Sequence, residues 1–137
     1  MRYYCWGYRV VNVYMGVNSC YARREGVFVA RVKHPGIDTV AEAVGILYLI
    51  VRDRRRGWTY DQDNHCRKVR MTNRLFVERA NYVRVLARRH GAGPHTLAVI
   101  DRLVEYVLST GKLPRTVTYR RKRYSVDALV EAVLVRT

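Results

Sequence analysis

The chain contains 137 residues, which allows one compact domain with an appended segment and excludes two independent cores of ordinary size. Hydrophobic residues make up 49% of the chain, so a wholly disordered basic polypeptide is also excluded. The formal net charge of +15 excludes a protein whose surface charges balance one another, and it requires an anionic partner.

The first segment, residues 1–35, has the composition of β-strands. It is rich in tyrosine and valine, and in a strand over residues 27–32 Val27, Val29 and Arg31 would alternate with Phe28, Ala30 and Val32. Residues 16–18 (Gly-Val-Asn) have turn-forming character. Local propensity alone therefore predicts a β-hairpin in this segment.

A buried helix is predicted after the Pro-Gly pair at 35–36. The tetrad Thr39–Glu42 has the capping-box pattern, and an almost unbroken apolar run follows it to Val51. Because such a helix is apolar on nearly every side, it must be surrounded by protein, in the core or at a subunit contact. We expect it to end in the basic cluster 52–56 and to be followed by a polar loop over residues 58–66.

The next helix is predicted over residues 70–90, with Gly91 as its C-terminal cap. At about 100° per residue, five polar side chains fall on one stripe, and apolar side chains gather on the opposite side. The helix therefore has one face for the core and one basic face for a ligand. The stripe consists of Arg70, Arg74, Asn81, Arg84 and Arg88.

Two more helices are predicted in the remainder of the chain. One covers residues 94–110, because Pro94 suits a first helical position and Gly111 suits a cap. The other covers residues 125–135, where Ser125 can cap a run of apolar residues at helical spacing. Between them, residues 113–123 are expected to form a basic loop.

The predicted fold class is therefore mainly α. We expect an N-terminal arm over residues 1–37 and a C-terminal helical bundle over residues 38–137. No run approaches the roughly 20 apolar residues of a membrane span, and residues 1–8 are too polar and aromatic for a signal peptide. A soluble protein made in the cytoplasm is expected.

The sequence predicts no enzyme, no metal ion and no cofactor, because no catalytic or ligand group has convincing spacing. Asp61 and Asp63 resemble the start of a calcium loop, but the glycine and distal glutamate of that loop are missing. The cysteines at 5, 20 and 66 form no C-x-x-C pair. We interpret them as buried thiols, with a Cys5–Cys20 bridge as the alternative.

The basic residues point to phosphate as the anionic partner. Arginine supplies 22 of the 26 basic residues, and its planar guanidinium binds phosphate bidentately. On B-form DNA, 15 charges correspond to about 25 Å of duplex. The basic residues are spread along the whole chain, which favours binding to the nucleic-acid backbone over reading of the bases. The predicted DNA-binding residues are Arg2, Arg9, Arg23, Arg24, Arg31, Lys33, Arg54, Arg55, Arg56, Arg67, Arg70, Arg74, Arg84 and Arg88.

Three stretches of the C-terminal half carry a resemblance to a known family. These are Leu86–Pro94 (LARRHGAGP), residues 100–106 with Ile100-Asp101, Leu103 and Tyr106, and Ser125–Val130 (SVDALV). In order and spacing they resemble the major coat proteins of filamentous archaeal viruses, the rudivirus, lipothrixvirus and tristromavirus group. The resemblance covers about half of the chain.

The resemblance implies a structural virion protein without enzymatic activity, located in the nucleocapsid. It implies that an N-terminal arm wraps linear double-stranded DNA in the A form, while helical bundles face outward. Dimers, formed with itself or with a paralogous coat protein, would stack into a helical filament, which some members of the group surround with a lipid envelope. The family arms are largely helical, whereas residues 1–33 of this chain have a strand-like composition.

Two other functions would also account for the positive charge of the chain. A sequence-specific regulator could place helices 70–90 and 94–110 as a helix-turn-helix, but the second helix offers few base-reading side chains. An RNA-binding protein is suggested by residues 24–29, a poor match to an RNP1 strand. A discrete protected operator would favour the regulator, and preference for single-stranded RNA would favour the RNA binder.

Overall fold

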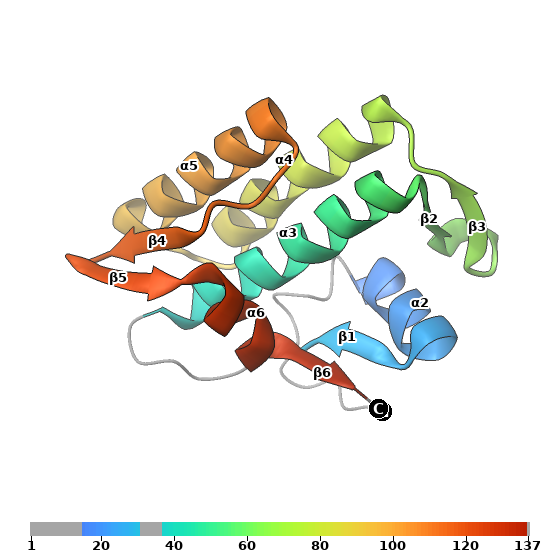
Figure 1. The fold of residues 1–137 in the computed structure, drawn as a ribbon, viewed down its shortest axis with the longest axis horizontal. Helices are drawn as coiled ribbons and strands as arrows, with labels where there is room; N and C mark the ends of the chain where they lie inside the picture. Colours follow the sequence, from blue (N-terminus) through green and yellow to red (C-terminus); the bar gives the residue numbers. More distant parts are fainter. Residues whose placement is uncertain (1–14, 31–36, 137) are drawn as a thin grey trace.

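A computed structural model of the chain describes residues 15–30 and 37–136 and confirms the mainly α fold class. Figure 1 shows the helices around one long central helix, with the strands paired in short two-stranded ribbons at the periphery. The helices are α2 (Met15–Glu25), α3 (Asp38–Arg56), α4 (Asn73–Arg89), α5 (Pro94–Thr110) and α6 (Val126–Val133), with a short 3-10 helix η2 (Gln62–Asn64). The strands are β1 (Val27–Val29), β2 (Trp58–Asp61), β3 (Arg67–Arg70), β4 (Thr116–Tyr119), β5 (Lys122–Ser125) and β6 (Leu134–Arg136).

The central helix α3 is buried on nearly every side, as its sequence predicts. It packs against α4, α5 and α6, so its apolar side chains form the middle of the core. The expected capping box does not form, because the helix already begins at Asp38 and its N-cap, Ile37, makes no side-chain capping bond. The basic cluster forms the last turn of α3. Gly57 then ends the helix in the left-handed conformation, with φ of 89°.

Helices α3, α4 and α5 form an antiparallel layer (Figure 1). At one end of the layer, Arg54 near the end of α3 donates a hydrogen bond to Asn73 at the start of α4. At the other end, Thr96 in the first turn of α5 lies 3.1 Å from the hydroxyl of Tyr119 in β4. We call these the β2–β3 end and the β4–β5 end. The predicted helices 70–90 and 94–110 are confirmed as α4 and α5, apart from the first residues of α4.

Three antiparallel ribbons complete the fold, and two of them correct predicted loops. Residues 58–70 form the β2–β3 hairpin, in which Trp58 pairs with Arg70. The expected loop 113–123 contains β4 and the start of β5, whose tip is a two-residue turn. Ser125 caps α6 as predicted, by accepting a hydrogen bond from the amide of Ala128.

The predicted N-terminal hairpin is wrong within the described residues. Residues 16–18, expected to turn, lie inside helix α2, and β1 pairs with β6 near the C-terminus rather than with a preceding strand. Cys20, Tyr21 and Val29 are at most 2% exposed and belong to the main core. Residues 20–29 are thus part of the folded unit, while the division into an arm over 1–37 and a bundle over 38–137 stays a prediction.

A disulfide corrects the prediction of buried thiols. Cys20 of α2 is bonded to Cys66, which directly precedes β3, so the alternative Cys5–Cys20 bridge is also wrong. Both residues are buried. Spacing could not reveal this bond, because it joins two elements 46 residues apart in sequence. The bridge fixes helix α2 against the β2–β3 hairpin.

Replacing Gly45 with alanine is expected to destabilise the protein. Helix propensity alone would favour alanine by about 1 kcal/mol. However, an added Cβ would lie 2.5 Å from Val133 Cγ2 and 3.1 Å from Val29 Cγ1, at the point where α3, α6 and β1 meet. Overpacking of this kind costs about 1–3 kcal/mol, so the free energy of unfolding should fall in chemical denaturation.

A matched control is Gly93→Ala, because an added Cβ at that position meets nothing within 4 Å. Its unfolding free energy should change by less than that of Gly45→Ala. An equal or greater stability of Gly45→Ala than of the unaltered protein would show that the core can accommodate the methyl group.

Candidate nucleic-acid interface

Seven basic side chains gather at the β2–β3 end. The hairpin lies beside α2 and the junction of α3 with α4 (Figure 1). Hydrogen bonds place the neighbouring arginines there: Arg24 donates to the backbone oxygen of His65 at 3.3 Å, and Arg23 donates to Cys66 Sγ at 2.7 Å. All seven residues are exposed. We define them as the hairpin surface: Arg23, Arg24, Arg54, Arg67, Lys68, Arg70 and Arg74.

Six residues of the hairpin surface were predicted from sequence, and Lys68 was not. Strand β3 is short and highly charged, and the sequence predicts no element for residues 67–69 and a helix that begins at Arg70. In the structure, β3 carries Arg67, Lys68 and Arg70, and it presents them on a backbone fixed by pairing with β2. Charge density alone was the signal that could have identified Lys68.

Arg56, also predicted to bind DNA, lies instead in an internal ion-pair network. It contacts Glu25 and Asp53 at 2.9 Å each, and Arg52 contacts Glu25 at 2.8 Å. Asp53 is fully buried and also accepts hydrogen bonds from Tyr21 and Thr59. Because its charge is used within the protein, Arg56 positions the hairpin rather than offering a free cation.

The network holds Glu25 in its charged form. Burial by itself would raise the pKa of Glu25, but the hydrogen bond from Tyr60 and the charges of Arg52 and Arg56 lower it below its ordinary value of 4.5. Burial and the bond to Glu25 raise the pKa of Tyr60 to about 12, so Tyr60 stays a donor. Arg79 closes the network by donating to Thr59 Oγ1 at 2.6 Å.

We therefore expect stability to depend on Glu25 at acid pH. Because the pKa of Glu25 is lower in the folded state, its contribution is fully present above the unfolded-state pKa and is lost as the pH falls through the folded-state pKa. Denaturant midpoints measured from pH 7 down to pH 3 should fall. Glu25→Gln should be less stable at pH 7, by about 1–3 kcal/mol, and should lose less stability on acidification. An unchanged acid slope in this variant would contradict the assignment.

Two cations contact the ring of Trp58, one from the end of α3 and one from β3. The guanidinium carbon of Arg56 lies 3.5 Å from the centroid of the Trp58 ring, and Lys68 Nζ lies 4.4 Å from it. Tyr60 contacts the same ring edge-to-face at 5.4 Å. Three neighbouring side chains therefore already contact the Trp58 ring, so the ring is not favourable as a stacking platform for unpaired bases.

The predicted stripe on helix 70–90 is divided by the structure. Arg70 lies in β3, and Arg74 is highly exposed with one loose contact of 3.4 Å to Glu78. Arg84 instead joins α4 to α5 through Glu105, at 2.8 Å, and Asp101. Arg88 is exposed near the β4–β5 end. The stripe therefore does not act as one surface.

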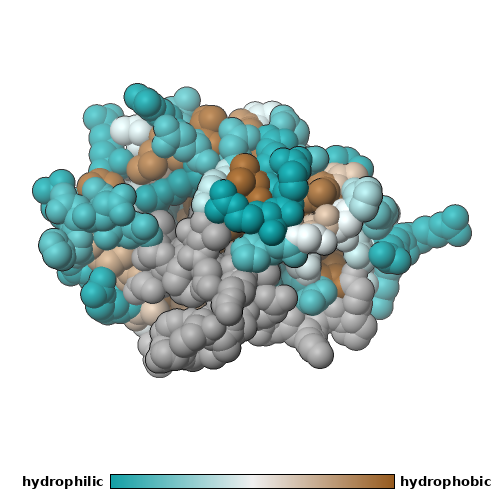
Figure 2. Space-filling model, turned by 180° about the vertical axis from the view of Figure 1, so that it is seen from behind, coloured by the Kyte–Doolittle hydropathy of each residue, from teal (hydrophilic) through white to brown (hydrophobic). Residues whose placement is uncertain are grey.

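The tip of the β4–β5 hairpin is a second basic surface, absent from the predicted residues. Arg120 and Arg121 form its two-residue turn, with φ of 51° and 68°. Such turns favour Asn-Gly, so two arginines there gave no turn signal. Left-handed backbone at non-glycine residues is costly and often occurs at functional sites. Figure 2 shows hydrophilic side chains projecting at the right edge, on the side of this hairpin. The tip consists of Arg120, Arg121, Lys122 and Arg123, all exposed.

Helices α4 and α5 do not have the arrangement of a helix-turn-helix. In that motif two helices cross at about 90–120°. Here they lie side by side (Figure 1), and the Arg84–Glu105 contact joins them along their length. The geometry disfavours a reading helix at this position.

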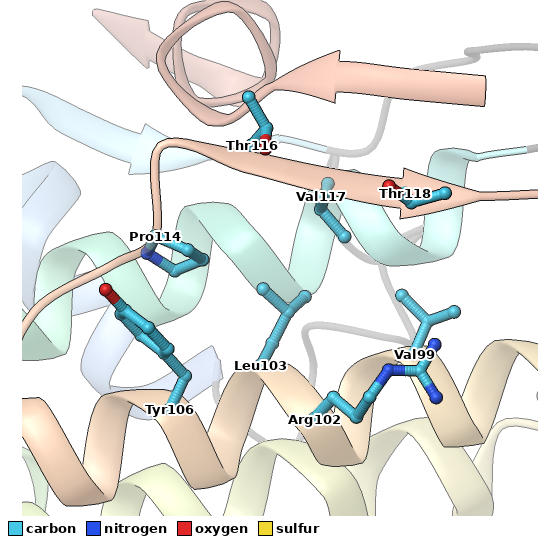
Figure 3. A pocket seen from close by; sticks show the side chains of 8 residues that line it. All are labelled: Val99, Arg102, Leu103, Tyr106, Pro114, Thr116, Val117 and Thr118. Carbon is cyan, nitrogen blue, oxygen red and sulfur yellow. The ribbon is translucent and has the colours of Figure 1, made fainter. Parts of the chain in front are cut away.

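A groove of about 260 Å³ lies between α5 and β4 (Figure 3). Tyr106 and Pro114 lie at one end, Val99 and Arg102 at the other, and Leu103 forms the middle of the floor. Arg102 is the one charged side chain among its lining residues. The groove therefore lacks the charge for a phosphate ligand.

The other predicted DNA-binding residues lie outside the hairpin surface. Arg55 is exposed in the last turn of α3 and does not belong to the hairpin surface as defined. Arg2, Arg9, Arg31 and Lys33 lie outside the described residues. Within the described ranges, no helix is long and apolar enough to cross a membrane, and no three His, Cys, Asp or Glu side chains are grouped as metal ligands. No family model, no curated protein and no solved structure matches the chain.

Proposed function

We propose that this protein coats linear double-stranded DNA through sequence-independent contacts to the phosphate backbone. The observation that carries the proposal is the pair of exposed basic surfaces at opposite ends of the three-helix layer. Within residues 15–30 and 37–136, ion pairs with carboxylates involve four arginines, Arg52, Arg56, Arg74 and Arg84. Most guanidinium groups of the described part therefore stay available to an external polyanion.

The positions of the two surfaces favour binding along a duplex. Helix α3 has 19 residues, which at about 1.5 Å per residue corresponds to about 28 Å. That length is close to the roughly 25 Å of duplex whose phosphates would match the net charge. The contacts go to backbone rather than to base edges, because the exposed cations lie on hairpins and helix ends.

Duplex DNA is a better ligand than single-stranded nucleic acid for this surface. Single-strand binding proteins place exposed aromatic rings along a basic groove, so that successive bases can stack. Next to the hairpin surface, the ring of Trp58 already contacts Arg56 and Lys68. Assembly of dimers into a helical filament, with self or a paralogous chain, and location in a virion are parts of the same proposal, motivated by the family resemblance.

The direct test is assembly on linear duplexes of unrelated sequence. We expect saturation at a constant number of protein molecules per unit length, continuous nuclease protection and filaments in electron micrographs. Binding curves for AT-rich and GC-rich duplexes should differ by less than about threefold, because phosphate contacts carry little sequence information. A short protected site on one sequence would instead establish a regulator, and tighter binding to single-stranded RNA would establish an RNA-binding protein.

A further inference from the structure

A separate pocket of about 290 Å³ lies between α3, the segment that joins α5 to β4, and the start of α6. One face of α3 supplies Tyr48, Arg52 and Arg55, and the connecting segment supplies Lys112 and Arg115. Four cations thus line one small hollow. Asp127, in the first turn of α6, is the single acidic residue of the lining.

The cations of this pocket are held on fixed backbone. Gly111 caps α5 in the left-handed conformation, and Thr110 Oγ1 accepts a hydrogen bond from the amide of Lys112 at 3.1 Å. The amide of Val126 donates to the oxygen of Arg115 at 3.0 Å, which joins the segment to α6. Little backbone ordering would then oppose ligand binding.

Most of the positive charge in the pocket is not neutralised within the described part of the chain. Arg55, Lys112 and Arg115 are exposed and make no contact with a carboxylate there. Arg52 is paired with Glu25, but its Nε is buried without a hydrogen-bond partner in the described structure. A buried donor without an acceptor is unfavourable. The other three cations of the pocket are available to an anionic ligand.

The remainder of the lining is apolar. Val51, Leu113, Pro114 and Val126 contribute hydrocarbon surface, and Tyr48 adds a half-buried ring. A volume of about 290 Å³ is at the lower limit for small-molecule sites, which range from about 300 to 1,000 Å³. The pocket therefore fits one small ligand that combines a strongly anionic group with a less polar body.

We propose that this pocket binds the phosphate of a single nucleotide, with the cations on the phosphate and the apolar lining against the sugar and base. The phosphate could come from a free mononucleotide or from the 5′-terminal nucleotide of a DNA strand. This site is distinct from the hairpin surface, and its existence does not depend on duplex coating.

The test uses the full-length protein at about 0.15 M salt, where nonspecific charge attraction is screened. Adenosine monophosphate is titrated by calorimetry and by NMR, and adenosine without phosphate is the ligand control. We expect the monophosphate to bind and to shift resonances of residues 48–55, 112–115 and 126–127. Adenosine should bind at least about tenfold more weakly, because the charge-assisted contacts are lost.

Two charge-matched variants separate the pocket from duplex binding. In K112A/R115A, monophosphate affinity should fall at least tenfold, while duplex affinity changes far less. In R67A/R70A, which removes the same charge from the hairpin surface, monophosphate binding should persist while duplex affinity falls. Comparison of duplexes with a 5′-phosphate and a 5′-hydroxyl identifies the source: a preference for the 5′-phosphate that the pocket variant abolishes assigns the strand end. If neither the monophosphate nor the 5′-phosphate depends on the pocket residues, the inference is overturned, whatever the result for duplex coating.

Discussion

Replacing Arg54, Arg67 and Arg70 together with alanine is expected to weaken binding to every duplex by about two to three orders of magnitude at 0.1 M salt. Each lost phosphate contact should lower the slope of log affinity against log salt by about 0.9, so the slope should fall by about 2.7. All three side chains are exposed, and substitutions at such positions usually change stability by less than about 0.5 kcal/mol. Filter binding or fluorescence anisotropy across a salt series measures both quantities.

The matched control removes the same charge elsewhere. Arg84, which is paired with Glu105, is replaced together with Arg102 and Arg136, which lie outside the two basic surfaces. The control should change the salt slope by less than about one, since few phosphate contacts are lost. Equal falls in both triple variants would show that total charge, rather than the hairpin surface, determines affinity.

Removing the disulfide should have the largest effect on stability. Cys20 and Cys66 are separated by 46 residues, and closing a loop of that length removes unfolded-state entropy worth about 4 kcal/mol. Cys20→Ser with Cys66→Ser should therefore lower the melting temperature by roughly 10–20 °C in calorimetry. The hairpin surface should lose duplex affinity as well, because the bridge holds α2 against the hairpin.

The third cysteine supplies the control for the disulfide. Cys5→Ser should leave the melting temperature of the oxidised protein unchanged, and reduction should lower it as in the unaltered protein. If Cys5→Ser lowered the melting temperature while Cys66→Ser did not, Cys20 would be bonded to Cys5 instead, which is the alternative bridge considered from the sequence.

Sequence periodicity predicted the long helices well. Helices α3 and α5 were located within a few residues, because apolar side chains recur at helical spacing and glycine or proline marks their ends. Residues 15–25 were mispredicted because Gly16 and Asn18 favour a turn, while the tyrosine- and valine-rich sequence around them favours strands. The covalent bond at Cys20 and burial of Tyr21 hold the helix in place, and neither is visible in a local window.

The sequence could not predict the hairpins, nor could it show which arginines are exposed and which are paired with carboxylates. The turn at Arg120 and Arg121 lacks the usual residues, so β4 and β5 had no sequence signal. Helical spacing placed Arg84 on a ligand-facing stripe, but spacing cannot show that Glu105 of the next helix neutralises it. Total charge was informative about the partner, whereas the choice among individual arginines depended on the carboxylates that tertiary structure brings near them.

The pairing of β1 with β6 has a consequence for the order in which the chain can fold. Val27 pairs with Arg136, and the amide of Ala30 donates to the oxygen of Val133. A ribosome makes these partners more than a hundred residues apart, so β1 emerges long before the strand that completes it. Until then the nascent chain exposes an unpaired apolar edge, which is a surface that chaperones recognise and that promotes aggregation. Contacts this distant in sequence also slow folding, so closure of the β1–β6 ribbon is expected to be a late, post-synthetic step.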